Sequence, residues 1–299
     1  MLSDLYNLVL RATRLPALRR RRQQGAIVLC YHNVVQHRGT GGDPGLHLSS
    51  ADFTRQMRWI SGHYDVVSLR ELADRLIGGR AVSGTAAVTF DDAYRGVFDH
   101  AWPVLREVGL PATVFVPTGL VDLGEGFWWD HPSVTAGATA ERRDAFLAEY
   151  RGDTHLIAEA AYGQAQRNTP DSHRPARWST IARAASEGLD LGIHSASHRN
   201  LTRVDDDDFA EELTASRARL LAETGVLAES FAYPYGLFDA RVRDAVRRAG
   251  YRVGLTVDYG MNELGGDPWA LRRINIPASI SAAAFEVWLA GLRPQFRRR

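Results

Sequence analysis

The chain of 299 residues contains no lysine and only one cysteine. All 36 basic residues are therefore arginines, and because 35 acidic residues balance them, the formal net charge is only +1. A chain without a strong positive charge lacks the electrostatic signature of a nucleic-acid-binding protein. The lone Cys30 excludes a disulfide within the chain, which fits a reducing compartment, and we expect it to be a buried thiol in a strand.

Long apolar runs are also missing, and none reaches the length of a membrane span. The N-terminus does not resemble a secretory signal, because its arginines follow the short apolar run instead of preceding it. We therefore expect a cytoplasmic location. Residues 1–22 could still form a basic amphipathic helix in peripheral contact with an anionic membrane, although Pro16 interrupts the pattern. The alternative is a basic tail that is disordered or packed locally.

From Gly25 onward, short runs rich in β-branched residues alternate with longer segments of helical periodicity. This alternation is typical of an α/β protein with a parallel sheet, and seven or eight repeats suit a closed or nearly closed (β/α) barrel. The expected strands are 26–34, 64–69, 86–92, 112–118, 189–195, 230–236, 251–258 and 271–277. The expected helices are 51–62, 70–78, 97–108, 178–188, 206–225, 239–249 and 281–292.

We predict a basic segment, residues 1–24, followed by one domain, residues 25–293. The segment from about 123 to 177 is too long for a simple connection and has its own helical pattern at roughly 139–160. We interpret it as an insertion that folds over the mouth of the barrel.

Two carboxylates, Asp91 and Asp92, stand side by side where the apolar run AAVTF ends. Like charges in contact destabilise each other unless something offsets them. Adjacent side chains of a strand point to opposite faces, so both can serve one site only if the backbone turns there. The alternative is a structural role, in which the two carboxylates stabilise the N-terminus of the helix that follows.

Another expected strand ends in the sequence HSASH, which contains His194 and His198. Two neutral imidazoles and one carboxylate form a three-ligand set that holds Zn²⁺ and leaves a position open for water. Because parallel strands end at one rim, a divalent cation there would also offset the charge of Asp91 and Asp92. Alone, a pair of histidines four residues apart is more often packed or exposed.

The stretches TFDDAYRG, HSASHRNL and FAYPYG, in this order, resemble the polysaccharide deacetylase family, also called the NodB-homology group. The resemblance implies a deformed (β/α)7-type barrel that removes N- or O-linked acetyl groups from carbohydrates with one divalent metal ion. It implies these roles: Asp91 as general base, Asp92, His194 and His198 as metal ligands, and the backbone N–H of Tyr235 as oxyanion donor. Zinc is the expected metal, with cobalt, nickel or manganese as alternatives.

The chain departs from the family pattern at two chemically important positions. An arginine is common where this chain has Ala232, and a histidine that serves as general acid is common where it has Pro277. Proline cannot donate a proton. His32 and His131 are the candidate replacements for the acid, although either could be a packed or solvated histidine.

Smaller departures affect the surroundings of the expected site. Arg273 could bind substrate or orient Asp91 in place of the missing arginine. Ala93 replaces a usual glycine, which matters only if the backbone needs a positive φ there.

Two further clusters allow two interpretations each. Trp128 and Trp129 could stack on a sugar, or could form a small core over the barrel. The run Asp205 to Asp208 favours the start of the following helix, and a second cation site is the alternative.

The predicted substrate is an acetylated sugar, oligosaccharide or lipid-linked glycan of polysaccharide or glycoconjugate biosynthesis. One alternative is an amide hydrolase of the same fold acting on a non-acetyl group, such as a deformylase. The other is a metal- and glycan-binding module with weakened catalysis. No feature of the sequence predicts an oligomeric state.

Overall fold

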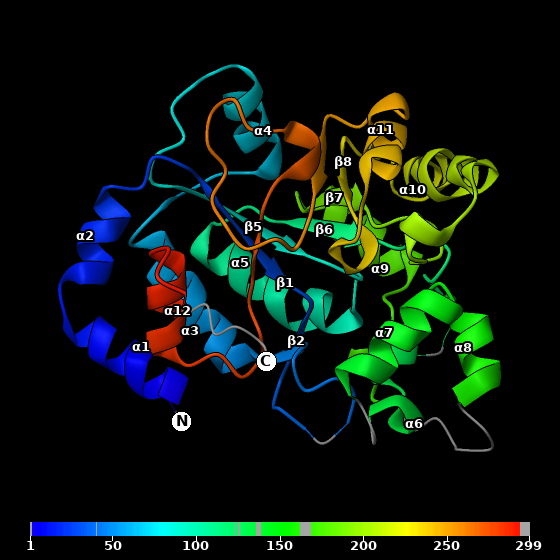
Figure 1. Ribbon diagram of the computed structural model, residues 1–299, viewed down its shortest axis with the longest axis horizontal. Helices are drawn as coiled ribbons and strands as arrows, with labels where there is room; N and C mark the ends of the chain where they lie inside the picture. Colours follow the sequence, from blue (N-terminus) through cyan, green and yellow to red (C-terminus); the bar gives the residue numbers. More distant parts are fainter. Residues whose placement is uncertain are drawn as a thin grey trace.

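The computed structural model describes residues 2–39, 41–122, 124, 126–135, 139–161 and 169–293. A curled parallel sheet lies at the centre of the structure (Figure 1). Its strands follow the order β10 (Ile274–Asn275), β1 (Ile27–Tyr31), β5 (Thr85–Phe90), β6 (Thr113–Val116), β7 (Asp190–Ile193), β8 (Ser230–Ala232) and β9 (Val253–Leu255), and β4 (Asp65–Val66) pairs with β5. A separate parallel pair consists of β2 (Asn33–Val35) and β3 (His47–Ser49).

One short segment links the two edges of the curled sheet. The backbone N–H of Leu271 donates to the carbonyl of Gly254 in β9, at 2.8 Å. Three residues later Ile274 pairs with Leu29 of β1. The sheet therefore nearly closes on itself, which confirms the predicted deformed (β/α) barrel with seven strands along its main path.

Helices pack around the outside of the sheet because each has one apolar face (Figure 1). Several begin at a side chain that accepts a backbone N–H, namely Ser49, Ser68 and Asp239. The surrounding helices are α3 (Ser50–Ser61), α4 (Leu69–Ile77), η1 (Val97–Ala101), α5 (Trp102–Val108), α9 (Trp178–Ser186), η6 (Ala210–Ala215), α10 (Ser216–Thr224) and α11 (Ala240–Arg248).

The basic N-terminal segment is helical and lies against the end of the domain. It forms α1 (Leu2–Ala12) and α2 (Leu15–Arg21), and α1 packs on α12 (Ala282–Leu289). The break between α1 and α2 falls just before Pro16, as the sequence predicts. None of the helices in the described residues is both long and apolar enough to span a bilayer.

The insertion differs from its sequence-based prediction in one respect. The single helix expected at 139–160 is two helices, α7 (Ala140–Glu149) and α8 (Thr154–Ala161). The chain turns between them because Arg151 and Gly152 take positive φ angles of 57° and 71°. The insertion also contains η2 (Trp128–Asp130), α6 (Pro132–Thr135) and η3 (Asp171–His173).

Candidate active site

The carboxyl ends of the parallel strands bring the chemically active side chains together. Asp91 and Asp92 follow β5, and His194 follows β7. His194 Nε2 lies 3.5 Å from Asp92 Oδ1 and 3.8 Å from Asp91 Oδ2. These residues are 2–3% exposed, so their charges interact across a space from which water is largely excluded.

His198 completes a compact set of three donor atoms. Its Nε2 lies 3.1 Å from His194 Nε2 and 3.2 Å from Asp92 Oδ1. The two rings are inclined by 77°. Donors placed about 2 Å from one tetrahedral ion are separated by about 3.3 Å, so these three atoms fit a single divalent cation. Asp92 Oδ1 is buried without a hydrogen-bond partner, which leaves it available as a ligand.

The backbone takes left-handed conformations where the donor residues lie. Asp92 has a φ of 69°, Ser195 a φ of 62° and His198 a φ of 57°. The turn at Asp92 lets two successive carboxylates face the same site, as sequence reasoning required. Ala93 also takes a positive φ of 51°, so replacing the usual glycine costs about 1 kcal/mol of backbone strain here.

Two outer contacts fix the histidines. His194 Nδ1 donates to the carbonyl of Ala232 at 2.8 Å, which directs the lone pair of Nε2 toward the donor set. The loop between the histidines is held by buried Glu212, which accepts the backbone N–H groups of Ala196 and Ser197, each at 3.0 Å. Sequence reasoning missed Glu212 because it lies within a helical segment with no distinguishing pattern.

Burial and charge set the protonation states of the site. Burial raises the pKa of Asp92 to about 6 and lowers the pKa of His194 to about 4 and that of His198 to about 3. Burial also acts to raise the pKa of Asp91, but attraction to Arg273 and His194 outweighs it and holds that pKa below its ordinary value. At neutral pH the imidazoles are therefore neutral and both carboxylates ionised, the states that ligands and a base require.

Arg273 is paired with the carboxylate of Asp91. Its guanidinium is fully buried and makes two hydrogen bonds to the carboxylate, each of 2.7 Å. A third contact, from Nε to the carbonyl of Thr256 at 2.6 Å, holds it in place. The orienting role predicted for Arg273 therefore fits the geometry better than the substrate-binding role.

The tryptophans of the insertion are packed as a small core over the barrel. Trp128 is 1% exposed and Trp129 is 5% exposed. Trp128 Nε1 donates to the hydroxyl of Tyr235 at 3.1 Å, and the ring of Trp129 lies 4.7 Å from that of His198. The packing alternative therefore fits better than stacking on a sugar, although both rings border a cavity of about 780 Å³ that also reaches Tyr235 and Arg143.

The two candidate acids lie in different surroundings. His32 is in the site, because one of its ring nitrogens lies within 4.8 Å of both an Asp91 carboxylate oxygen and Cys30 Sγ. Burial lowers the pKa of His32, and Asp92 and Asp91 oppose that effect. The Nδ1 of His131 instead accepts the backbone N–H of Ser133 at 3.2 Å, and burial is the cause of its lowered pKa. The geometry favours His32.

The acidic run before η6 pairs with arginines. Asp206 contacts Arg241 at 2.6 Å, and Asp208 contacts Arg199 at 3.5 Å. These ion pairs fit the interpretation as a helix start better than that of a second cation site.

A second set of two histidines and one aspartate, which sequence reasoning missed, lies where the insertion contacts β3. We call His47, Asp130 and His173 the lid triad. All three are buried, and His47 Nε2 lies 3.0 Å from Asp130 Oδ1. The hydroxyl of Tyr94, which follows the paired carboxylates, donates to Asp130 Oδ2 at 2.7 Å. The three residues come from β3, η2 and η3, which share no sequence motif, so only the fold brings them together.

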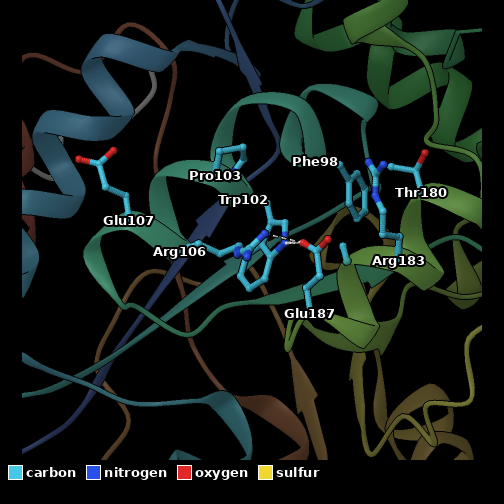
Figure 2. Close-up of a pocket in the computed structure, with 9 residues that line it drawn as sticks. Phe98, Trp102, Pro103, Arg106, Glu107, Thr180, Arg183 and Glu187 are labelled. Atoms are coloured by element: carbon cyan, nitrogen blue, oxygen red, sulfur yellow. Dashed lines mark hydrogen bonds and ion pairs between the residues drawn. The ribbon is translucent and has the colours of Figure 1, made fainter.

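A further hollow of about 550 Å³ lies on the outside of the molecule between α5 and α9. Figure 2 shows Trp102 and Arg106 directed toward Glu187 across it. It contains none of the residues at the strand ends and no cluster of possible metal ligands. We therefore place the chemistry at the rim of the barrel.

A parallel (β/α) barrel with a buried set of two histidines and one aspartate, next to an oriented second aspartate, defines a hydrolase-like site. The family model for polysaccharide deacetylases matches residues 79–254. The chain belongs to this family, which confirms the resemblance seen in the motifs and the prediction of an enzyme of the deacetylase class.

Individual relatives are distant. The chain is 20% identical to a putative polysaccharide deacetylase of Bacillus subtilis over 268 residues, which are 89% of this chain and 76% of the relative. It is 20% identical over 215 residues to a poly-β-1,6-N-acetyl-D-glucosamine N-deacetylase of Staphylococcus aureus, covering 71% of this chain but only 61% of that protein's length.

Solved structures show the same fold. The match to IcaB from Ammonifex degensii has a TM-score of 0.65 at 20% identity and covers 90% of this chain and 98% of that one. The match to the deacetylase PplD of Streptococcus pyogenes has a TM-score of 0.65 at 18% identity and covers 90% and 99%. At these identities the likeness supports the barrel and not the details of the site.

Proposed function

We propose that this protein is a metal-dependent hydrolase that removes acetyl groups from a carbohydrate. The observation that carries the proposal is the convergence of Asp92, His194 and His198, whose donor atoms lie 3.1–3.5 Å apart beside the ionised Asp91. Two imidazoles and a carboxylate suit Zn²⁺ best, and Co²⁺, Ni²⁺ or Mn²⁺ also accept this set. When bound, such an ion polarises an acyl carbonyl and makes water more acidic.

Asp91 is the proposed general base. It is ionised at neutral pH because Arg273 holds its pKa low, and the paired hydrogen bonds fix the direction of its carboxylate. It can therefore accept a proton from the attacking water. The low pKa makes Asp91 a weak base, so the rate depends on how strongly the water is acidified at the neighbouring donor set.

The remaining roles fall to two residues beside the donor set. The ring of Tyr235 lies 4.5 Å from that of His198, and its left-handed backbone, with a φ of 59°, turns the main chain at the site. Its backbone N–H is the proposed donor to the oxygen that gains charge as the carbonyl is attacked. His32 is the proposed donor of the proton that the leaving amine requires.

The proposed substrate is the acetamide of an N-acetylated amino sugar in an oligosaccharide or lipid-linked glycan. The name of the Staphylococcus aureus relatives, poly-β-1,6-N-acetyl-D-glucosamine N-deacetylase, supports this choice. The cavity of about 780 Å³ beside Tyr235 offers room for sugar residues next to the reacting group. A cytoplasmic location, which nothing in the fold contradicts, stays part of the proposal.

The test measures acetate release from β-1,6-linked N-acetylglucosamine oligomers by the zinc-loaded protein, together with its metal content. Asp91→Asn should lower the rate by about 100-fold or more while the zinc content stays the same. Asp207→Asn, at an exposed aspartate, is the matched control. If the protein holds zinc but releases nothing from acetylated sugars, the proposal fails, and release of another acyl group or mere glycan binding becomes the function.

The same assay separates the two candidate acids. His32→Gln should slow acetate release by about 10- to 100-fold and alter the alkaline limb of the pH profile. His131→Gln should leave both unchanged. The opposite result would assign the acid to His131.

A further inference from the structure

The first helix of the protein is packed with a polar residue inward and apolar residues outward. Asn7 of α1 is 2% exposed, whereas Leu5, Leu8 and Val9 are 60%, 55% and 58% exposed. Helices on the surface of a globular protein normally bury their apolar stripe. The amide oxygen of Asn7 has no hydrogen-bond partner, so its burial is not offset by a contact of that oxygen.

The exposed apolar residues form one continuous stripe. Leu5, Leu8 and Val9 stand at the i, i+3 and i+4 positions of a helix and therefore share one side, opposite Asn7. That side faces away from α12, on which α1 packs. Leu15 and Leu18 of α2 have the same spacing and are 38% and 44% exposed. In Figure 1 both helices lie at the outer edge of the molecule.

The N-terminal segment that forms these two helices has a net positive charge, whereas the rest of the chain is net negative. Residues 2–22 contain six arginines and one aspartate, a net charge of +5, while the whole chain has +1, so the remainder carries −4. Arg19, Arg21 and Arg22 are exposed next to Leu18. Charge of one sign is thus gathered beside the apolar stripe, where it complements an anionic surface.

We propose that the outer faces of α1 and α2 form a docking surface for a membrane that contains anionic lipids. The stripe of Leu5, Leu8 and Val9 enters the boundary between headgroups and acyl chains, and the arginines bind the lipid phosphates. A second copy of this chain is the poorer occupant, because its own docking surface would bring another charge of +5 to the interface. This inference does not depend on the proposed function.

The experiment measures co-sedimentation of the full zinc-loaded chain with vesicles. We expect binding to phosphatidylcholine vesicles that contain phosphatidylglycerol, much weaker binding to phosphatidylcholine alone, and release by salt. Absence of binding to the anionic vesicles would overturn the proposal. Binding that is equal on both vesicles and unaffected by salt would also overturn it.

Two variants and one control test the surface itself. The triple change Leu5→Ser, Leu8→Ser and Val9→Ser, and separately Arg19→Gln, Arg21→Gln and Arg22→Gln, should each weaken vesicle binding by about 10-fold or more. These side chains point outward, so melting temperature and acetate release from soluble oligomers should not change.

The matched control is Leu221→Ser with Leu227→Ser, two leucines on another part of the molecule that are 41% and 51% exposed. It should leave vesicle binding unchanged. Equal loss in this control would show that binding is nonspecific and would overturn the proposal. A dimer in light scattering that dissociates in the apolar triple variant, without vesicle binding by the monomer, would instead assign the surface to a second copy.

Discussion

The protein contains two buried clusters with the same composition, and their geometry differs. The donor set at the barrel rim consists of Asp92, His194 and His198, and the lid triad consists of His47, Asp130 and His173. In the donor set the two imidazoles are inclined by 77°, whereas in the lid triad they are stacked, 3.7 Å apart and only 9° from parallel.

The angle between the rings decides which cluster can hold an ion. A histidine nitrogen directs its lone pair within the plane of the ring, and Zn–N bonds are about 2.0–2.1 Å long. An ion bound to both stacked rings would have to lie out of each ring plane by about half of their 3.7 Å separation. It could not then meet either lone pair. Inclined rings, as in His194 and His198, let both lone pairs meet at one point.

The carboxylate of the donor set is also more available to an ion than the carboxylate of the lid triad. Asp92 Oδ1 has no hydrogen-bond partner, while Asp130 Oδ1 accepts the backbone N–H of Asp43 at 2.7 Å. The lid triad also packs closely around Gly42, because a Cβ added there would stand 2.5–2.9 Å from all three of its donor atoms. Residue types alone therefore do not make a metal site; imidazoles with converging lone pairs and an unsatisfied carboxylate oxygen are also needed.

The largest expected effect tests this contrast directly. His198→Ala should lose the zinc and lower acetate release by more than about 100-fold, because it removes one of three ligands. His173→Ala should keep one zinc per chain, because its stacked ring is not aimed at an ion. Metal analysis after dialysis checks both. Two zinc ions per wild-type chain, with one lost in His173→Ala, would break the comparison.

The next largest effect concerns Asp91, the carboxylate beside the donor set. Asp91 is held by a buried cation, so Arg273→Met should destabilise the protein by about 3–5 kcal/mol by leaving that charge unpaired. The pKa of Asp91 should rise because the strongest attraction that opposes the effect of burial is removed, and the acid limb of the activity profile should move to higher pH. Urea unfolding and a pH profile measure the two effects.

Arg273→Lys is the matched control for that change. Lysine keeps the charge but cannot form the paired contact. Compared with Arg273→Met, this variant should therefore be more stable, and the acid limb of its activity profile should lie at lower pH. Unchanged stability and an unchanged pH profile in Arg273→Met would contradict the orienting role.

Much of the barrel and its rim could be predicted from sequence, for a physical reason. The strands are continuous buried runs such as Ile27–Tyr31, and their polar continuations must meet at one edge if the strands are parallel. The partner of Asp91 could only be guessed. Arg273 is 182 residues away in sequence, and only the near closure of the sheet brings it to β5.

The lid triad was beyond sequence reasoning for a related cause. His47 and His173 lie in the three-residue elements β3 and η3, which are too short to show a periodicity, and Asp130 follows the aromatic residues that could also stack on a sugar. Its hydrogen bonds depend on how these elements pack over Tyr94, which no local pattern specifies. The break between α7 and α8 escaped prediction because Arg151 takes a positive φ that nonglycine residues rarely adopt.

A smaller effect tests whether the lid triad is structural. Tyr94→Phe removes the hydroxyl that donates to Asp130 and accepts Trp129 Nε1 at 2.7 Å. Because both partners stay buried, we expect a loss of about 1–3 kcal/mol of unfolding free energy with unchanged zinc content. Thermal unfolding and metal analysis check this pair of outcomes. Tyr64→Phe, which removes a buried hydroxyl that donates to the carbonyl of Leu289 at 2.9 Å, is the control for losing a hydrogen-bonded hydroxyl outside both clusters. Loss of zinc in Tyr94→Phe would show that the two clusters are coupled.

The smallest expected effect is the contribution of His173 in the lid triad to the pH dependence of stability. Burial, with repulsion from His47, lowers the pKa of His173 to about 4 from an ordinary value near 6.5. Between these values the unfolded chain binds the proton and the folded chain does not, so this group makes stability fall as the pH drops from 6.5 toward 4. His173→Gln removes that contribution, and the loss of stability between pH 7 and pH 5 should shrink by about 1–2 kcal/mol. The exposed His155→Gln, whose ring is solvated in both states, should leave the curve unchanged. Urea unfolding at pH 7 and pH 5 measures this loss of stability. An equal loss in the wild type and in His173→Gln would contradict the prediction. It would mean that the stacked ring is protonated in the folded protein, with Asp130 as its counterion.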